Sequence, residues 1–122
     1  MPGLYLVGVK GFCEAEEFPV EYGRTVTIGR SRDNDISLRN SKKWRELPKE
    51  ERSGHREFLA ISRTHCRIAY QDDKWVEVQD TSANGTFVDG KKVARLVISD
   101  IKDKSHEIRL GPVETFILEW RQ

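Results

Sequence analysis

Short runs in which apolar and polar residues alternate follow one another along most of this chain. Residues 25–28 place Val26 and Ile28 on one face and threonines on the other. Residues 65–70 alternate in the same way, with Cys66 and two further apolar side chains on one side. Because successive side chains of a strand point to opposite faces, a period of two predicts strands with one buried face.

Turn residues divide these runs into hairpins. Asp89-Gly90 is a dipeptide that supplies the positive φ angles of a two-residue turn, and Gly111-Pro112 marks another turn. The predicted strand pairs lie at 65–70 with 75–79, 86–88 with 91–93, and 107–110 with 115–120. With a further strand at 4–9, these elements predict an all-β sandwich or barrel, in a single domain over residues 1–122.

One segment departs from this pattern. Residues 39–57 read RNSKKWRELPKEERSGHRE, and seven basic against four acidic residues give the segment a net charge of +3. Ser41 is a suitable helix cap, and Pro48 can end one helical turn or begin a second. Nineteen residues between strands exceed an ordinary loop, so we expect a partly helical basic insertion near residues 39–57 with a functional reason.

Composition narrows the class of protein. The net charge of +1 gives no basis for a general affinity for nucleic acid or membranes, and no apolar run approaches the roughly 20 residues of a membrane span. No secretory signal is visible, so we expect an intracellular protein, cytoplasmic or, in a eukaryote, nuclear. Cys13 and Cys66 can be reduced thiols, which is the simpler interpretation, or a disulfide. The cysteines and histidines lack the paired spacing of a metal site, so we expect no metal and no cofactor.

Three groups of residues suit the binding of a phosphate. Arg30 follows a predicted strand, and its guanidinium offers planar, permanently charged donors, while Gly29 lets the backbone bend. Ser62 adds a hydroxyl donor and Arg63 a second cation. His65, three positions after Ser62, can hydrogen-bond back to the loop and fix its shape. By itself, each of these short motifs is also typical of an ordinary strand end or surface turn.

Asn84 and Gly85 complete the set. The Asn84 amide both donates and accepts, which suits gripping the main chain of an extended peptide, and Gly85 can take a positive φ. In their order along the chain, three stretches resemble the motifs of the forkhead-associated (FHA) domain: GRSRDNDISL at 29–38, SRTH at 62–65 and DTSANGTFVDG at 80–90. The resemblance covers roughly residues 4–120 and extends to IRLG at 108–111, which is similar to the closing hairpin of that family.

The resemblance implies an FHA-like β-sandwich of about eleven strands, with its binding loops at one end. It also implies a module that binds phosphothreonine peptides and recruits proteins phosphorylated by Ser/Thr kinases. The residue roles that it implies are phosphate binding for Arg30, Ser62 and Arg63, peptide-backbone binding for Asn84, and structural roles for Gly29, His65 and Gly85. In that family the residue three positions after the phosphothreonine commonly sets specificity.

This chain also departs from the family pattern. Ala83 stands where many members have a serine or threonine that assists the phosphate, Ser105-His106 replaces a common Gly-Asp, and the insertion lengthens a usually short loop. The insertion either reshapes the peptide site or is a solvated decoration, and its Trp44 and neighbouring lysines could instead contact nucleic acid, although nearby glutamates oppose this.

Alternatives to phosphopeptide binding remain at this stage. A phosphorylation-independent protein-binding or self-association module on the same fold is the main one, and the oligomeric state stays open. We expect no enzyme and no catalytic residues, because Ser62, His65 and Asp80 lack the sequence context of a hydrolase triad.

Overall fold

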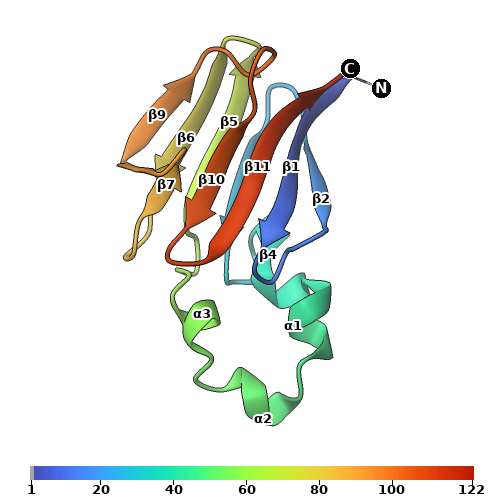
Figure 1. Cartoon of the computed structure of the whole chain (residues 1–122), viewed down its shortest axis with the longest axis vertical. Helices are drawn as coiled ribbons and strands as arrows, with labels where there is room; N and C mark the ends of the chain where they lie inside the picture. Colours follow the sequence, from blue (N-terminus) through green and yellow to red (C-terminus); the bar gives the residue numbers. More distant parts are fainter. Residues whose placement is uncertain (1) are drawn as a thin grey trace.

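Two stacked β-sheets form the body of the molecule in the computed structural model, which describes residues 2–122 (Figure 1). The six-stranded sheet has the order β2 (Glu17–Val20), β1 (Gly3–Lys10), β11 (Glu114–Arg121), β10 (His106–Leu110), β7 (Thr86–Val88), β8 (Lys91–Val93). The five-stranded sheet has the order β4 (Ile36–Ser37), β3 (Thr25–Gly29), β5 (Cys66–Asp72), β6 (Trp75–Asp80), β9 (Arg95–Ile98). The predicted all-β sandwich of about eleven strands is confirmed for the described residues.

The three predicted hairpins are present, as β5–β6, β7–β8 and β10–β11. Asp89 (φ 51°) and Gly90 (φ 84°) form the two-residue turn between β7 and β8, because both take the positive φ that such a turn requires. The pattern analysis missed β2, β4 and β9. β2 holds Pro19, which lacks an N–H and is tolerated here because β2 is an edge strand.

The core fills the space between the two sheets. Alternate positions of β1 and β5 are buried, as the period of two predicts, and Leu6, Ile68 and Phe116 are fully inaccessible to solvent. Each such side chain contributes about 1.5–3 kcal/mol to folding by leaving water. Cys13 and Cys66 are both buried free thiols, and burial raises the pKa of Cys66 to about 12.

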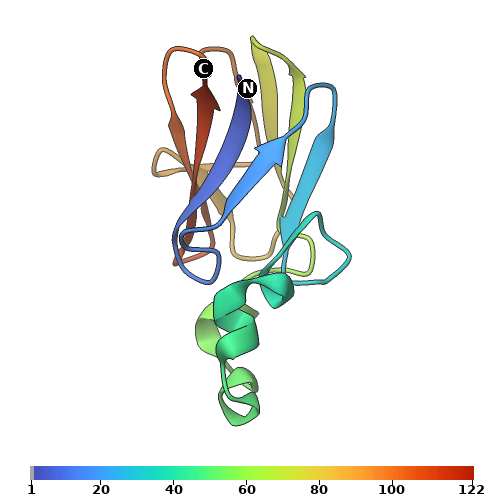
Figure 2. The ribbon, with the colours of Figure 1, turned by 90° about the vertical axis from the view of Figure 1, so that its right-hand side faces the viewer.

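A helical segment, residues 38–59, projects from one end of the sandwich, opposite the end at which β1 begins and β11 ends (Figures 1 and 2). It consists of η1 (Leu38–Asn40), α1 (Lys42–Glu46), α2 (Lys49–Arg52) and α3 (Arg56–Leu59). Ser41 caps α1 by accepting a hydrogen bond from the Trp44 N–H at 3.2 Å, and α2 begins directly after Pro48. Helices this short are not stable alone, so packing must hold the segment in place.

An aromatic cluster provides that packing. The rings of Trp44 and Phe58 stack with their centroids 3.7 Å apart, and Phe12 from the β1–β2 loop meets both edge-on. Trp44 is 6% exposed and Phe58 2% exposed. The segment is therefore anchored to the sandwich, and the buried Trp44 ring is not free to stack on a nucleic-acid base.

Candidate functional site

Two of the loops that carry the predicted site residues are hydrogen-bonded to each other at the end of the sandwich that carries the helical segment. The Arg30 N–H donates to the Ser62 carbonyl at 3.0 Å, and the Ser31 N–H donates to the Arg63 carbonyl at 3.1 Å. The Asn34 side-chain amide also donates to the Arg63 carbonyl, at 2.5 Å. The loop after β3 and the loop before β5 thus form one rim.

Gly29 is required by this close approach. A Cβ atom at residue 29 would lie 2.2 Å from the Arg63 carbonyl oxygen and 2.9 Å from the Asn34 amide nitrogen. Neither distance is compatible with a side chain, so the two loops can meet only if residue 29 has none. The constraint at Gly29 is space, not a positive φ.

His65 joins the third loop to this rim. Its side chain is fully buried, its Nδ1 accepts from the Ser62 N–H at 3.1 Å, and its Nε2 donates to the Gly85 carbonyl at 2.8 Å. These partners require the neutral ring with its proton on Nε2. Burial lowers the pKa of His65 below its usual value, although the Gly85 carbonyl and the Asp80 carboxylate oppose the shift.

The Asn-Gly turn is held by a carboxylate at its base. Gly85 takes a φ of +99°, and its N–H donates to the Ser82 hydroxyl at 2.8 Å. Asp80 accepts from the Ser82 N–H at 3.0 Å, from the Ser82 hydroxyl at 2.5 Å and from the Thr86 hydroxyl at 2.8 Å. Burial acts to raise the pKa of Asp80, but these hydrogen bonds outweigh it and hold the pKa below its usual value.

Ser62 and Asn84 keep groups available for a ligand. The Ser62 hydroxyl oxygen accepts from the Ala83 N–H at 3.0 Å, which leaves the hydroxyl proton to donate elsewhere. The Asn84 amide nitrogen donates to the Ala60 carbonyl at 2.8 Å, which orients its oxygen as an acceptor. Ala83 has no hydroxyl, but its backbone N–H fixes Ser62.

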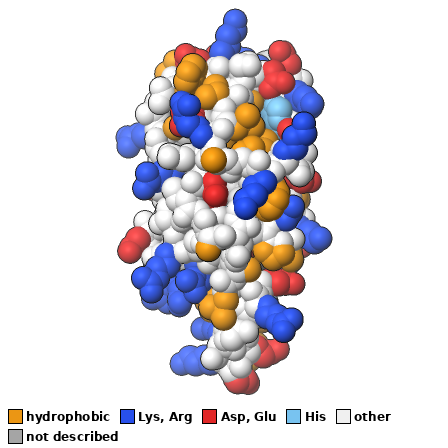
Figure 3. All heavy atoms as spheres, turned by 90° about the vertical axis from the view of Figure 1, so that its left-hand side faces the viewer, with side chains coloured by type: hydrophobic (Ala, Val, Ile, Leu, Met, Phe, Trp, Pro, Cys, Tyr) orange, Lys and Arg blue, Asp and Glu red, His pale blue; other side chains and the backbone are white. Residues whose placement is uncertain are grey.

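An open cavity of about 400 Å³ lies against the rim, and its lining is almost entirely basic. The lining residues are Arg30, Ser31, Arg32, Arg39 and Arg63. Among residues 2–122, none of these four arginines forms an ion pair with a carboxylate. On the face in Figure 3, acidic and basic side chains are interspersed over the sandwich, and several Lys and Arg side chains gather along one edge toward the helical segment.

Of the residues predicted to bind phosphate, Arg30 and Arg63 line this cavity directly, and Ser62 adjoins it through its bond to Arg30. Sequence reasoning missed Arg32 and Arg39 as cavity residues. Arg32 lies two positions after Arg30, and Arg39 is the first residue of the basic segment. The available signals were thus an alternating Arg-x-Arg pattern and a local excess of positive charge.

The helical segment supports two of these arginines from below. The Arg30 and Arg39 guanidinium carbons lie 5.9 and 5.3 Å from the centre of the Phe58 ring. At this range the electron-rich face of the ring attracts a cation. The helical segment therefore supplies Arg39 to the wall of the cavity, and its Phe58 ring lies under Arg30, a second wall residue.

Asn84 lines a second cavity, of about 440 Å³. Its lining residues are Ala60, Asn84, Phe87, Arg109, Gly111 and Pro112. The Arg109 guanidinium carbon lies 4.0 Å from the centre of the Phe87 ring. The loop at residues 60–63 joins the two cavities, because Ala60 lines one and Arg63 lines the other.

The FHA domain model matches residues 26–111. The chain belongs to the FHA family. This is a family of interaction modules, generally non-catalytic, known for phosphopeptide recognition. The matched region contains all of the predicted site residues.

Solved FHA structures share the fold. The FHA domain of the Chlamydia trachomatis CT664 protein is 24% identical over 96% of each chain, with a TM-score of 0.68. The FHA domain of a hypothetical protein from Arabidopsis thaliana is 25% identical, covers 100% of this chain and 88% of that one, and has a TM-score of 0.70. A structure from a study of phosphothreonine-dependent FHA domain interactions is 23% identical over 98% of each chain, with a TM-score of 0.65. A comparison with curated protein sequences found no match.

The geometry does not resemble a hydrolase triad. His65 Nδ1 is occupied by the Ser62 backbone N–H, so the ring is not placed to take a proton from the Ser62 hydroxyl.

In the described part of the FHA domain no cluster of three or more metal-ligating side chains occurs. Nor does any helix within residues 2–122 have the length and apolar character needed to cross a lipid bilayer.

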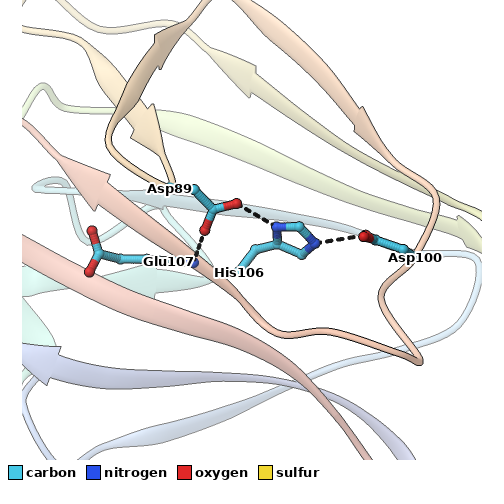
Figure 4. A network of polar contacts seen from close by, with 4 residues as sticks. All are labelled: Asp89, Asp100, His106 and Glu107. Atoms are coloured by element: carbon cyan, nitrogen blue, oxygen red, sulfur yellow. Dashed lines mark hydrogen bonds and ion pairs between the residues drawn. The ribbon is translucent and has the colours of Figure 1, made fainter.

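His106, a departure from the family pattern, forms a separate polar network at the start of β10, the end of the strand away from Gly111 (Figure 4). Its Nδ1 lies 2.6 Å from Asp89 and its Nε2 lies 2.7 Å from Asp100, and Asp89 also accepts from the Glu107 N–H at 2.9 Å. Burial acts to lower the pKa of His106, but the two carboxylates outweigh it and raise the pKa. The His106 ring ties the β7–β8 turn, through Asp89, to the loop before β10, through Asp100.

Proposed function

We propose that this FHA domain binds phosphothreonine-containing proteins through the rim formed by residues 29–31, 62–65 and 82–86. The observation that carries the proposal is the basic cavity, where Arg30 and Arg63 face one space and no carboxylate among the described residues pairs with them. A phosphothreonine brings a charge near −2 and three strong acceptor oxygens, which such a cavity complements.

Each residue has a role that follows from its surroundings. Arg30 and Arg63 supply charge-assisted donors to the phosphate, and the free hydroxyl proton of Ser62 donates to a further oxygen. The Asn84 amide oxygen accepts from a main-chain N–H of the bound peptide. Gly29, His65 and Gly85 are positioning residues that keep the three loops together. We further infer that residues 1–122 act as one domain, in an intracellular protein.

The comparisons support this proposal by analogy. One similar FHA structure comes from work on phosphothreonine-dependent interactions, and another, Mycobacterium tuberculosis EmbR, is in complex with a low affinity phosphopeptide. Both are about one-fifth identical to this chain, so the ligand must be established on this protein itself.

The decisive comparison uses degenerate peptide pools that differ only at one fixed residue: phosphothreonine, phosphoserine or threonine. Fluorescence anisotropy should give binding to the phosphothreonine pool, weaker binding to the phosphoserine pool and none to the threonine pool. Equal binding to the phosphothreonine and threonine pools would overturn the proposal.

The same titration tests the second candidate, a phosphorylation-independent protein-binding or self-association module. The observation in its favour is Ala83, which removes a side-chain donor from the rim. Under the self-association alternative, the protein alone would sediment as a dimer. Under the protein-binding alternative, an unphosphorylated partner would still bind the Arg30→Ala variant.

A further inference from the structure

The basic cavity holds more positive charge than one phosphate requires. The proposed function uses Arg30 and Arg63, yet Arg32 and Arg39 line the same space of about 400 Å³. A phosphothreonine carries a charge of about −1.5 to −2. Four guanidinium groups around a single phosphate would therefore keep roughly two uncompensated positive charges.

The neighbouring carboxylates do not remove that excess. Asp35 accepts from the Thr27 N–H at 2.9 Å and from the Thr27 hydroxyl at 3.2 Å, and it lines a different cavity, with Val26 and Ile36. Asp33 lies 3.4 Å from the Ser31 hydroxyl, and it forms no ion pair with any arginine of the described residues. The charge of the cavity is thus left for a ligand to balance.

Arg39 is held at its position by the fold. Its backbone N–H donates to the Ser37 hydroxyl at 3.2 Å at the start of η1, and its guanidinium lies over the Phe58 ring, which is itself buried against Trp44. An arginine that is anchored at its backbone and at its head loses less freedom when it binds an anion than one extended into solvent.

The spacing and the volume both suit a second anion. From their distances to one ring centre, 5.9 and 5.3 Å, the Arg30 and Arg39 guanidinium carbons cannot be more than 11.2 Å apart. An extended peptide advances about 3.3 Å per residue, so charges one to three residues apart fall within this upper limit. At about 30 Å³ per water molecule, the cavity has room for roughly a dozen waters, much more than one phosphoryl group displaces.

We propose that this cavity reads two neighbouring negative charges on one peptide. A phosphothreonine binds Arg30 and Arg63, and a second anionic side chain within three residues of it, a phosphorylated residue or an Asp or Glu, binds Arg32 and Arg39. This inference rests on the proposed function, because the phosphothreonine fixes where the second charge falls.

The test is a set of peptides built on one phosphothreonine sequence selected from the degenerate pools. Each member adds phosphoserine, aspartate or uncharged serine at one position within three residues on either side. At one position or more, phosphoserine should tighten binding at least tenfold over serine, as measured by fluorescence anisotropy. Tightening by aspartate as well identifies acidic motifs as ligands, whereas tightening by phosphoserine alone identifies doubly phosphorylated ones.

Two matched variants separate the cavity from general electrostatics. In Arg32→Gln/Arg39→Gln the gain from the second charge should fall below about threefold. Arg45→Gln/Lys49→Gln removes the same charge from exposed positions of the helical segment outside the cavity and should keep the gain. Circular dichroism and thermal unfolding establish that both variants fold.

The inference is overturned if no position gives more than a threefold gain, or if both double variants reduce the gain equally. Its failure is distinguishable from failure of the proposed function. Binding of the singly phosphorylated peptide without any gain from a second charge removes only the inference. Equal binding of phosphorylated and unmodified peptides removes both.

Discussion

At the scale of single residues, this FHA domain separates residues that would contact a ligand from residues that place them. Arg30 and Arg63 line an open cavity. Gly29 lets two loops approach each other, and His65 hydrogen-bonds the loop that carries Ser62. Substitutions of the ligand-contacting residues should therefore lower affinity with little effect on stability. Substitutions of the positioning residues should lower stability.

Arg30→Ala should lower affinity for a phosphothreonine peptide by at least tenfold. The substitution removes charge-assisted hydrogen bonds that contribute about 1.5–3 kcal/mol each, and tenfold corresponds to about 1.4 kcal/mol. The free energy of unfolding should change by less than about 1 kcal/mol, because Arg30 forms no ion pair among the described residues and its contact with the Phe58 ring is a single cation–π interaction. Calorimetric titration and urea unfolding measure the two effects. Arg67→Ala, an exposed arginine of β5 outside both cavities, is the control and should leave affinity unchanged.

Gly29→Ala should destabilise the fold by about 1–3 kcal/mol, because the added methyl group would meet the Arg63 carbonyl oxygen at 2.2 Å and push the two loops apart. Urea unfolding gives the value. Gly3→Ala is the matched control, since a Cβ there makes only an ordinary contact with Tyr5 at 3.5 Å. Equal unfolding free energies for the two variants would contradict the packing argument.

At the scale of elements, the helical segment is part of the candidate site. Its Phe58 lies under Arg30 and Arg39, and its aromatic stacking ties α1 and α3 to the loop after β1. The segment should therefore affect ligand binding even where its own residues do not touch the ligand.

Phe58→Leu should weaken phosphopeptide binding about two- to thirtyfold, because the cation–π platform under two arginines contributes about 0.5–2 kcal/mol and leucine lacks it. Anisotropy titration measures the change. Phe18→Leu, at the tilted contact with Phe116 elsewhere in the sandwich, should alter stability but not affinity. If both variants keep full affinity, the helical segment is a decoration.

The network of His106, which joins the β7–β8 turn to the loop before β10, should make the free energy of unfolding depend on pH. Its raised folded pKa means that its stabilisation is complete below about pH 6.5, the unfolded value, and is lost as pH rises through the folded pKa. Asp89, Asp100 and, near Asp89, Lys104 are the charged groups around it.

His65 has the opposite sign, because its lowered folded pKa stabilises the protein above about pH 6.5 and less as pH falls. Because His65 also titrates, the free energy of unfolding of the wild type is compared with that of His106→Gln, by urea unfolding from pH 5.5 to 9. The gap between the two free energies should narrow as pH rises. A constant gap would mean that the pKa of His106 is the same in the folded and unfolded states, which would contradict the prediction.

The sequence predicted the elements better than it predicted the cavity. The period of two and the Asp89-Gly90 turn are local, and they placed three hairpins correctly. β4 has only two residues and β2 contains a proline, so neither carries a pattern that can be detected. Arg32 and Arg39 could not be placed in one cavity with Arg30 from the sequence. Their proximity depends on how the loops approach at Gly29 and, for Arg30 and Arg39, on the Phe58 ring that both guanidinium groups contact.

At the scale of the whole molecule, charge and geometry are distributed unevenly. A chain of net charge +1 concentrates four arginines at one cavity. This cavity lies at the end of the sandwich that carries the helical segment, because Arg39 belongs to that segment. Gly3 and Arg121 pair in the register of β1 with β11 at the opposite end. A label or surface tether near either terminus should therefore leave the candidate site accessible.

The most direct measurement of the central claim is an NMR titration of the isotopically labelled FHA domain with a phosphothreonine peptide and its unmodified twin. The account predicts amide shifts concentrated at residues 29–32, 62–64 and 83–85, with the phosphorylated peptide alone. Shifts confined to another surface, such as the β2 edge, or identical shifts with the unmodified peptide, would contradict it.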